Sequence, residues 1–515
     1  MSSQLLHLHD ETIGKGIPGA KAGRALCFVL GSLLVVLFAL RVVPEYWTSS
    51  DAYFFPRLAK DLLEDGGRLA DWVLISAPRF FPDMGIYFLS HLLYGDHLRV
   101  MQMAAYMLIL LQLSAVSLLC HRVSDDWRAS LVAGLAYVGT CSVLGNDKTS
   151  LALVAWHSGT FAVILICVYL LVGEKSFWLR ALTCAGLIIL LVLSNFLAVP
   201  ILLSGVAGWW VALSIARRRV SRQSVIQTVA VVGACGIGMA LYYALVPNSF
   251  NNPVHASGLS VEAVKDIPFV LESIKLSIMA LGSNVLFLSA LLLSLPALYV
   301  VRLQRDRFDI LLAMVGFWLA SALANEFLIA LGASNVDRYR MMPINGSIAM
   351  AAIASTLILS QFRGIHWAPL FILTPAVALG TTPADAARSR LFNRTVAEVN
   401  CLSEKVSETN GTWGVSDLQT AHRYSVLSNG ELNLLPSRGN KLSAPPAMFS
   451  RGWLTNTFYY VIAERRHSPA SYATKKWAYP LSRRLAISML GNPNEEHLCG
   501  TKVLMVYQKE ISVNR

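Results

Sequence analysis

Long apolar stretches recur along the chain and are separated by short polar segments. Each holds about 20 residues with few charges, enough to cross a hydrocarbon core of about 30 Å as an α-helix. We therefore predict an α-helical polytopic membrane protein with eleven transmembrane helices, at residues 24–43, 98–120, 127–145, 151–172, 177–194, 196–215, 225–246, 279–301, 308–331, 341–360 and 367–383. The first stretch is too long for the apolar part of a signal peptide, so we expect it to remain as an anchor.

The composition agrees with a membrane protein. Hydrophobic residues make up 55% of the chain and charged residues only 14%, whereas soluble proteins carry about 25% charged residues. The net charge of +12 lies largely in the short loops and in the C-terminal residues 384–515. This distribution is the one expected from membrane topology, so we infer no nucleic-acid partner.

The short loops on one side of the membrane are basic, as in HRVSDDWR (121–128), GEKSFWLR (173–180) and ARRRVSRQ (216–223). Basic loops stay in the cytoplasm, so residues 1–23 are expected to be cytoplasmic. An odd number of spans then places residues 384–515 outside. Because the spans are short, we expect a bacterial inner membrane and a periplasmic C-terminal domain.

The first outer loop, residues 44–98, is long and rich in acidic side chains. In AYFFPRLAKDLLEDGG (52–67) apolar positions recur at helical spacing, and a Gly-Gly pair ends the pattern. MGIYFLSHLLYG (84–95) is apolar but too short to cross a bilayer. Both are predicted to be helices along the membrane surface.

Residues 384–515 are predicted to form a small α/β domain. LQTAHRYSVL and RLFNRTVAEVNCLSEKVSE have helical patterns, and the expected strands are GTWGVS, ELNLLP, FYYVIAE and TKVLMVYQ. Cys401 and Cys499 are its two cysteines, and a pair in an oxidising compartment is expected to form a disulfide. The sequence holds no Gly-rich phosphate-binding motif, no CxxC and no His-rich metal motif.

Strongly polar residues of the predicted spans gather at the outer end of the membrane. Such residues usually face a cavity or a partner, and here they are His157, Asn195, Asn284, Asn325 and Glu326, followed by NVDRYRMMP. A secondary transporter would place them near the midplane, so the pattern favours a cavity open to the outside. Simpler roles stay open. Glu326 could form a structural ion pair with Arg338 or Arg340, His157 could be an interfacial histidine whose hydrogen bonds are satisfied, and both arginines could be anchors that extend their charges to the membrane interface.

Three short motifs resemble those of the GT-C class of membrane glycosyltransferases, in the branch that uses polyprenyl-phosphate-linked sugars. SSDAYFFP (49–56) carries Asp51 where that class has a carboxylate after the first span. FFPDMGIYFL (80–89) resembles the Pro-rich stretch before the second span, and NVDRYRMMPIN (335–345) the Arg-Tyr-x-x-Pro pattern before a late span. The usual acidic pair is absent at Asp51, which itself could be a helix N-cap.

The resemblance implies transfer of a sugar to an extracytoplasmic acceptor, a glycolipid, lipopolysaccharide or another envelope glycan, in a single displacement with inversion. Asp51 is then the general base, and Asp83, Asp61 or Asp71 supplies the second acid, with Asp83 preferred. Expected substrate-binding residues are Arg338, Tyr339 and Arg340 at the donor phosphate, with Lys148, His157 and Glu326 nearby, and Tyr53 and Trp72 stacking on sugars. No cofactor is required, and a divalent metal is possible but not indicated.

Two other classes of protein remain open. An O-antigen polymerase or ligase also uses outer-loop arginines, but would normally lack so large a C-terminal domain. A transporter or lipid flippase would show two inverted halves with matching broken helices, which the sequence does not reveal. The expected partners under the first interpretation are membrane lipid, the lipid-linked donor and the glycan or glycolipid acceptor.

Overall fold

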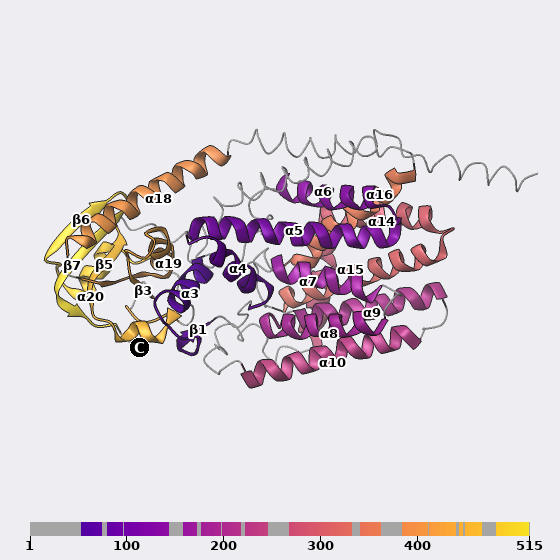
Figure 1. Ribbon diagram of the computed structural model, residues 1–515, viewed down its shortest axis with the longest axis horizontal. Helices are drawn as coiled ribbons and strands as arrows, with labels where there is room; N and C mark the ends of the chain where they lie inside the picture. Colours follow the sequence, from indigo (N-terminus) through magenta and orange to yellow (C-terminus); the bar gives the residue numbers. More distant parts are fainter. Residues whose placement is uncertain are drawn as a thin grey trace, which may run out of the picture.

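The computed structural model describes residues 53–74, 80–95, 97–143, 158–172, 177–196, 198–217, 222–245, 267–331, 340–361, 384–409, 411–438, 442–445, 449–465 and 480–513. Long helices form a bundle, and a region that contains strands lies at one end of it (Figure 1). The bundle helices are α5 (His97–Ser124), α6 (Trp127–Val143), α7 (Ser158–Leu171), α8 (Phe177–Ser194), α9 (Ala198–Arg217), α10 (Arg222–Leu245), α13 (Ile267–Ser283), α14 (Val285–Val301), α15 (Arg305–Ala330) and α16 (Ser347–Gln361).

The bundle is that of a polytopic membrane protein. Among the described residues, five helices are long and apolar enough to cross a membrane, or six if α13 and α14 count as one bent span. Helices α7 and α8 are apolar but shorter as described. The predicted spans 24–43 and 367–383 lie outside the described residues, so the count of eleven and the orientation of the termini stay predictions.

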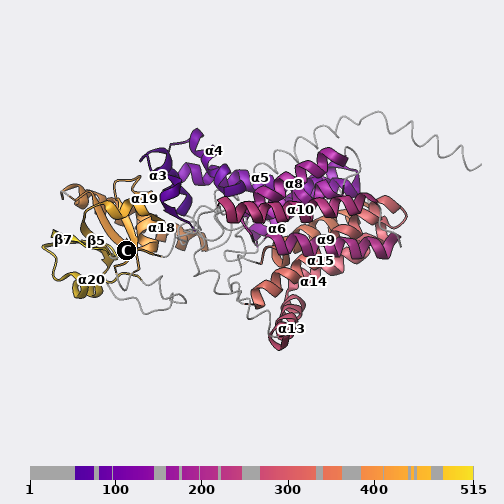
Figure 2. The ribbon, with the colours of Figure 1, turned by 90° about the horizontal axis from the view of Figure 1, so that it is seen from below.

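The expected span 279–301 is divided by Asn284. Its side-chain oxygen accepts hydrogen bonds from the backbone N–H groups of Leu286 and Phe287, at 3.0 and 3.2 Å. An Asn in this role starts a new helix, so α13 ends at Ser283 and α14 sets off at 73° to it. Figure 2 shows α13 leaning away from the remaining helices.

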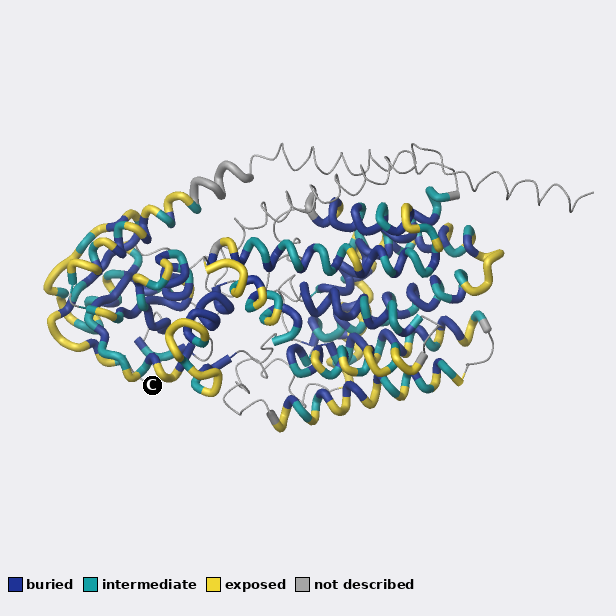
Figure 3. The backbone as a smooth tube through the Cα atoms, in the orientation of Figure 1, coloured by how far each residue is buried: buried dark blue, intermediate teal, exposed yellow. Residues whose placement is uncertain are grey.

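The first outer loop contains both helices expected from the sequence. They are α3 (Phe54–Leu63) and α4 (Gly85–Leu93), joined through the short 3-10 turn η2 (Leu69–Asp71), strand β1 (Trp72–Val73) and the irregular turn η3 (Phe80–Met84). Helix α4 keeps Leu92 and Leu93 78% and 60% exposed, as a helix on a membrane surface would. Helix α3 instead is buried on nearly all sides (Figure 3). The C-terminal region covers it, so α3 lacks the exposed apolar face that the sequence predicted for a surface helix.

The C-terminal region, residues 384–513, holds all of the expected strands. Its five-stranded sheet has the order β3-β2-β5-β7-β6, in which β3, β2 and β5 are parallel and β7 is antiparallel to both of its neighbours. The strands are β2 (Trp413–Asp417), β3 (Leu434–Ser437), β5 (Phe458–Glu464), β6 (Glu495–Cys499) and β7 (Lys502–Ile511), and the helices are α18 (Ala384–Ser407), α19 (Leu418–Leu427) and α20 (Arg483–Leu490). Strand β6 and helix α20 were not expected from the sequence.

A disulfide joins Cys401 in α18 to Cys499 in β6, with a Cα–Cα distance of 5.8 Å. This is the bond expected from the sequence. It crosses 98 residues and fastens the long helix to the edge strand of the sheet.

The loop of residues 44–98 contacts the C-terminal region around the carboxylate of Asp61. Asp61 on α3 accepts a hydrogen bond from Trp72 Nε1 at 2.6 Å and another from Trp453 Nε1 at 2.7 Å. Beside it, β1 pairs with β4 (Phe449–Ser450) in an antiparallel ladder. The buried guanidinium of Arg57 lies 4.6 Å from the ring centre of Trp453, a distance at which a cation is attracted to the ring.

Replacing both Cys401 and Cys499 by serine should destabilise the C-terminal region. Closing so long a loop restricts the unfolded chain, and losing such a bond typically costs about 2–5 kcal/mol. The measurement is resistance of this region to protease in the full-length protein at rising urea. A reducing agent should weaken the wild type in the same way and leave the double variant unchanged; if it affects both equally, the bond is not the cause.

Asp61→Ala should loosen the contact between α3 and the C-terminal region. Two buried indole N–H groups would lose their acceptor, at a cost of about 1–3 kcal/mol each. We expect the thermal midpoint of the purified protein to fall by several degrees. Asp71→Ala is the control, because Asp71 pairs with the exposed Arg68 at 3.2 Å and such pairs contribute about 1 kcal/mol or less. Equal effects of the two substitutions would contradict this role for Asp61.

Candidate functional site

A cavity of about 330 Å³ lies where α13 breaks into α14, beside the end of α15 and the turn η6 (Met341–Gly346). Its polar side chains are those of Ser283, Asn284, Glu326 and Arg340. Glu326 is only 4% exposed, whereas the side chain of Arg340 is 35% exposed, and its Nε lies 3.1 Å from Glu326 Oε1. The ion pair that the sequence analysis gave as an alternative role for Glu326 is therefore present, and its partner is Arg340.

The local structure explains why Arg340 reaches this cavity. Asn325, one residue before Glu326 on α15, accepts a hydrogen bond from the backbone N–H of Met342 at 3.1 Å. This contact holds the start of η6 against the end of α15. A guanidinium fixed in this way presents a planar set of N–H donors that matches the oxygens of a phosphate. The arrangement can therefore hold an anion at the mouth of the cavity.

A second polar cluster surrounds Asp83, whose side chain is fully buried in η3. A Cβ added to Gly159 would stand 2.4 Å from Asp83 Oδ2, so a residue without a side chain is required where α7 meets this carboxylate. Next to it, Phe81 N–H donates to Ser194 Oγ at 2.7 Å. These contacts dock the outer loop onto the ends of α7 and α8.

Elements of both sites contact the same helix, α7. Helix α7 contacts η3, which carries Asp83, and also η6, which follows Arg340. Thr160 of α7 in addition accepts a hydrogen bond from Asn195 Nδ2 at 3.1 Å. Asn195 and Asp83 thus both lie at the first described turn of α7.

Of the other expected site residues, Asp51, Lys148, His157, Arg338 and Tyr339 lie outside the described residues. Tyr53 and Trp72 are both fully buried, so neither offers an accessible face to a sugar ring in this structure. Burial raises the pKa of the Tyr53 hydroxyl well above its ordinary value, and the charge of Arg423 opposes that shift. Trp72 packs edge-on against Trp453, with ring centres 5.0 Å apart, and contributes to the contact around Asp61.

The three candidates for the second acid differ in their surroundings. Asp61 is engaged by the two indole N–H groups, and Asp71 pairs with Arg68 near the surface. Asp83 is the one that lies against the outer ends of the membrane helices. Asp83 is thus the candidate that packs against α7, the helix that also contacts η6 directly after Arg340.

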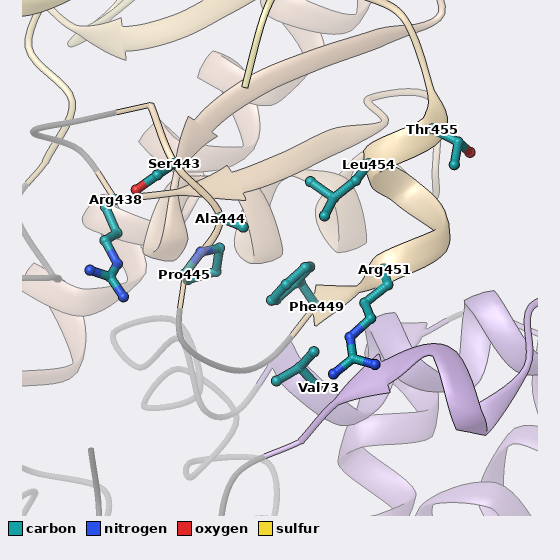
Figure 4. A pocket seen from close by; sticks show the side chains of 9 residues that line it. All are labelled: Val73, Arg438, Ser443, Ala444, Pro445, Phe449, Arg451, Leu454 and Thr455. Carbon is teal, nitrogen blue, oxygen red and sulfur yellow. The ribbon is translucent and has the colours of Figure 1, made fainter. Parts of the chain in front are cut away.

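Sequence reasoning missed a larger cavity of about 640 Å³ between β1 and the C-terminal region. Arg438 and Arg451 flank it, and Val73, Phe449 and Leu454 supply apolar walls (Figure 4). The Nε of Arg438 is buried and has no hydrogen-bond partner among the described residues. The two arginines are 13 positions apart in a segment without helical or strand periodicity, so no sequence signal pointed to this site.

The described part of the chain contains no group of three or more His, Cys, Asp or Glu side chains placed to hold a metal ion. The charged groups of the two clusters are the Glu326–Arg340 ion pair and the buried carboxylate of Asp83.

No protein-family model and no curated protein matches the chain in sequence. In structure, the chain is similar to ArnT from Cupriavidus metallidurans bound to undecaprenyl phosphate, with a TM-score of 0.57 and 11% identity. The similarity covers 93% of this chain and 98% of that protein. The resemblance to the GT-C class noted in the sequence is thus confirmed at the level of the fold, which this chain shares with ArnT over nearly its whole length.

Proposed function

We propose that the protein is a membrane glycosyltransferase that moves a sugar from a polyprenyl-phosphate-linked donor to an extracytoplasmic acceptor. One observation carries the proposal: the Arg340–Glu326 pair lines an outer-end cavity in the fold of a protein whose solved structure holds undecaprenyl phosphate. The proposed location is the inner membrane, with residues 384–515 in the periplasm.

The donor phosphate is proposed to bind at Arg340, with Arg338 and Tyr339 directly before it in sequence and Lys148 and His157 as further partners. Glu326 orients the Arg340 guanidinium through the ion pair between its carboxylate and Nε. Cations at this place stabilise the negative charge that develops on the leaving phosphate. In the lipid-linked donor, polyprenyl phosphate is itself the leaving group, so the reaction needs no nucleotide.

The acceptor hydroxyl is proposed to attack the anomeric carbon while Asp51 takes its proton. The bond between that carbon and the phosphate oxygen breaks in the same step, polyprenyl phosphate departs, and the configuration inverts. Asp83 supplies the second carboxylate from its buried position against α7. No cofactor takes part in this scheme.

The acceptor is proposed to be a glycolipid, lipopolysaccharide or another envelope glycan. The cavity flanked by Arg438 and Arg451 adjoins Val73 of the loop of residues 44–98. Its apolar walls and two cations fit a ligand that has both an apolar part and an anionic group. The acceptor would then enter between the first loop and the C-terminal region, on the side away from the cytoplasm.

Arg340→Ala should raise the KM for the lipid-linked donor about 10- to 100-fold, because a hydrogen bond to a charged group contributes about 1.5–3 kcal/mol. The assay is transfer of radiolabelled sugar from a panel of undecaprenyl-phosphate sugars into the glycolipid fraction of membranes. Arg340→Lys keeps the charge without the planar fork and should recover part of the loss. An unchanged KM in both variants would remove Arg340 from the donor site.

Asp51→Asn should lower kcat by about 10²- to 10⁴-fold, the usual contribution of a general base, with little change in KM. Asp83→Asn should lower kcat as well if it acts with Asp51. Asp71→Asn serves as the matched control on the same loop and should keep the wild-type rate. Transfer at the wild-type rate by Asp51→Asn would show the assignment of the base to be wrong, and the thermal midpoint of each variant separates loss of chemistry from loss of folding.

A further inference from the structure

Two arginines share one tyrosine ring at the end of the bundle far from the candidate site. The guanidinium carbon of Arg122 lies 4.8 Å from the ring centre of Tyr169, and that of Arg180 lies 5.8 Å from it. Arg122 is in the last turn of α5, Tyr169 is near the end of α7, and Arg180 is in the first turn of α8. Three helices therefore bring two positive charges to one place.

Nothing among the described residues neutralises this pair. The Nε and Nη2 atoms of Arg122 and the Nη1 atom of Arg180 are buried and have no hydrogen-bond partner in that part of the chain. Neither arginine forms an ion pair with a described acidic residue. Like charges repel, and buried charged donors are costly when they lack an acceptor. Within the described part of the chain, the two charges therefore have no anionic partner.

The position along the bundle identifies the kind of anion. Helix α5 starts at His97, whose Nε2 lies 3.9 Å from Glu64 of the first outer loop. Arg122 follows 25 residues later, about 38 Å away at 1.5 Å per residue. That length corresponds to the opposite membrane face, the one that the basic loops assign to the cytoplasm.

The surroundings favour a lipid as the source of the anion. The small cleft that Arg180 lines with Cys184 and Gln227 holds only about 10 Å³, too little for a headgroup, so the anion must approach from the outer surface of the bundle. On that part of α8, Trp178, Leu179 and Leu182 are 67%, 68% and 69% exposed. They offer apolar contact to acyl chains directly beside the guanidinium groups.

We propose that Arg122, Tyr169 and Arg180 form a binding site for the phosphate of an anionic phospholipid in the leaflet opposite the candidate catalytic site. Guanidinium groups bind phosphate oxygens through pairs of N–H donors, and basic pockets between transmembrane helices on the cytoplasmic side bind anionic headgroups. The site is independent of the proposed glycosyl transfer, which takes place at the other face.

The experiment uses the full-length protein in nanodiscs of phosphatidylcholine, with and without phosphatidylglycerol. Phosphatidylglycerol should raise the thermal midpoint of the wild type, and Arg122→Gln/Arg180→Gln should abolish most of that rise. In phosphatidylcholine alone the double variant should be at least as stable as the wild type, because it loses the repulsion. That comparison separates loss of the lipid site from a folding defect.

Binding is measured directly by titrating phosphatidylglycerol into the detergent-purified protein and following its retention by native mass spectrometry. The double variant should bind it at least tenfold more weakly. Arg302→Gln is the matched control: Arg302 lies over one ring, that of Tyr299, at 3.6 Å, and no second arginine among the described residues lies over that ring. Equal affinity of wild type and double variant, or an equal loss in Arg302→Gln, would overturn the proposal.

Inorganic phosphate provides the remaining arm of the test. If the site takes a lipid, millimolar phosphate should neither raise the thermal midpoint of the wild type nor displace phosphatidylglycerol. Stabilisation of the wild type by phosphate alone, and not of the double variant, would assign the site to a soluble anion and contradict the lipid proposal.

Discussion

The arrangement of the outer half of the molecule depends on one carboxylate that accepts two indole N–H groups. Asp61 accepts one hydrogen bond from Trp72 of its own loop and another from Trp453, which is 392 residues away in sequence. Arg57 lies over the same ring of Trp453. Burial lowers the pKa of Arg57 to about 10, while the charges of Asp65 and Asp61 oppose that shift. It is therefore still protonated at neutral pH, so a buried cation faces the aromatic rings and stabilises the nearby carboxylate.

This contact has consequences for the candidate site because the loop that it secures leads to both proposed carboxylates. Asp51 precedes α3 in sequence, and Asp83 follows β1 in η3. The C-terminal region thus holds the loop, and the loop brings Asp83 to the ends of α7 and α8. Arg340 is held separately, by Asn325 and Glu326 of α15. Helix α7 contacts both parts and sets their relative position.

The membrane helices combine close packing with broken ends. Gly208 on α9 and Gly316 on α15 allow these two helices to approach so closely that a Cβ on either would stand 2.2 or 2.5 Å from a carbonyl oxygen of the other helix. Small residues are the usual means of such close approach in membranes. Elsewhere the helices break or end instead: α13 and α14 meet at a bend at Asn284, and α15 ends at Ala330. Polar groups are tolerated there because they line a cavity rather than face lipid.

Much of the architecture could be predicted from local patterns. The apolar stretches indicated membrane helices, the helical spacing in residues 52–67 indicated α3, and the alternating segments near the C-terminus indicated four strands. The Cys401–Cys499 bond followed from two cysteines in one compartment. The Arg340–Glu326 pair was among the stated alternatives, because both residues bracket one short outer loop. Each of these features depends on residues near one another in sequence or on composition alone.

The sequence by itself determined that the chain is a polytopic helical membrane protein, because hydropathy and charge act within each segment. Only the tertiary structure decided that α3 is enclosed by the C-terminal region, that Trp72 serves this contact, and that Arg438 and Arg451 share a cavity. It also brought Arg122 and Arg180 onto one ring. These outcomes depend on contacts between distant segments, whose energies come from shape, burial and hydrogen-bond geometry that no local periodicity encodes.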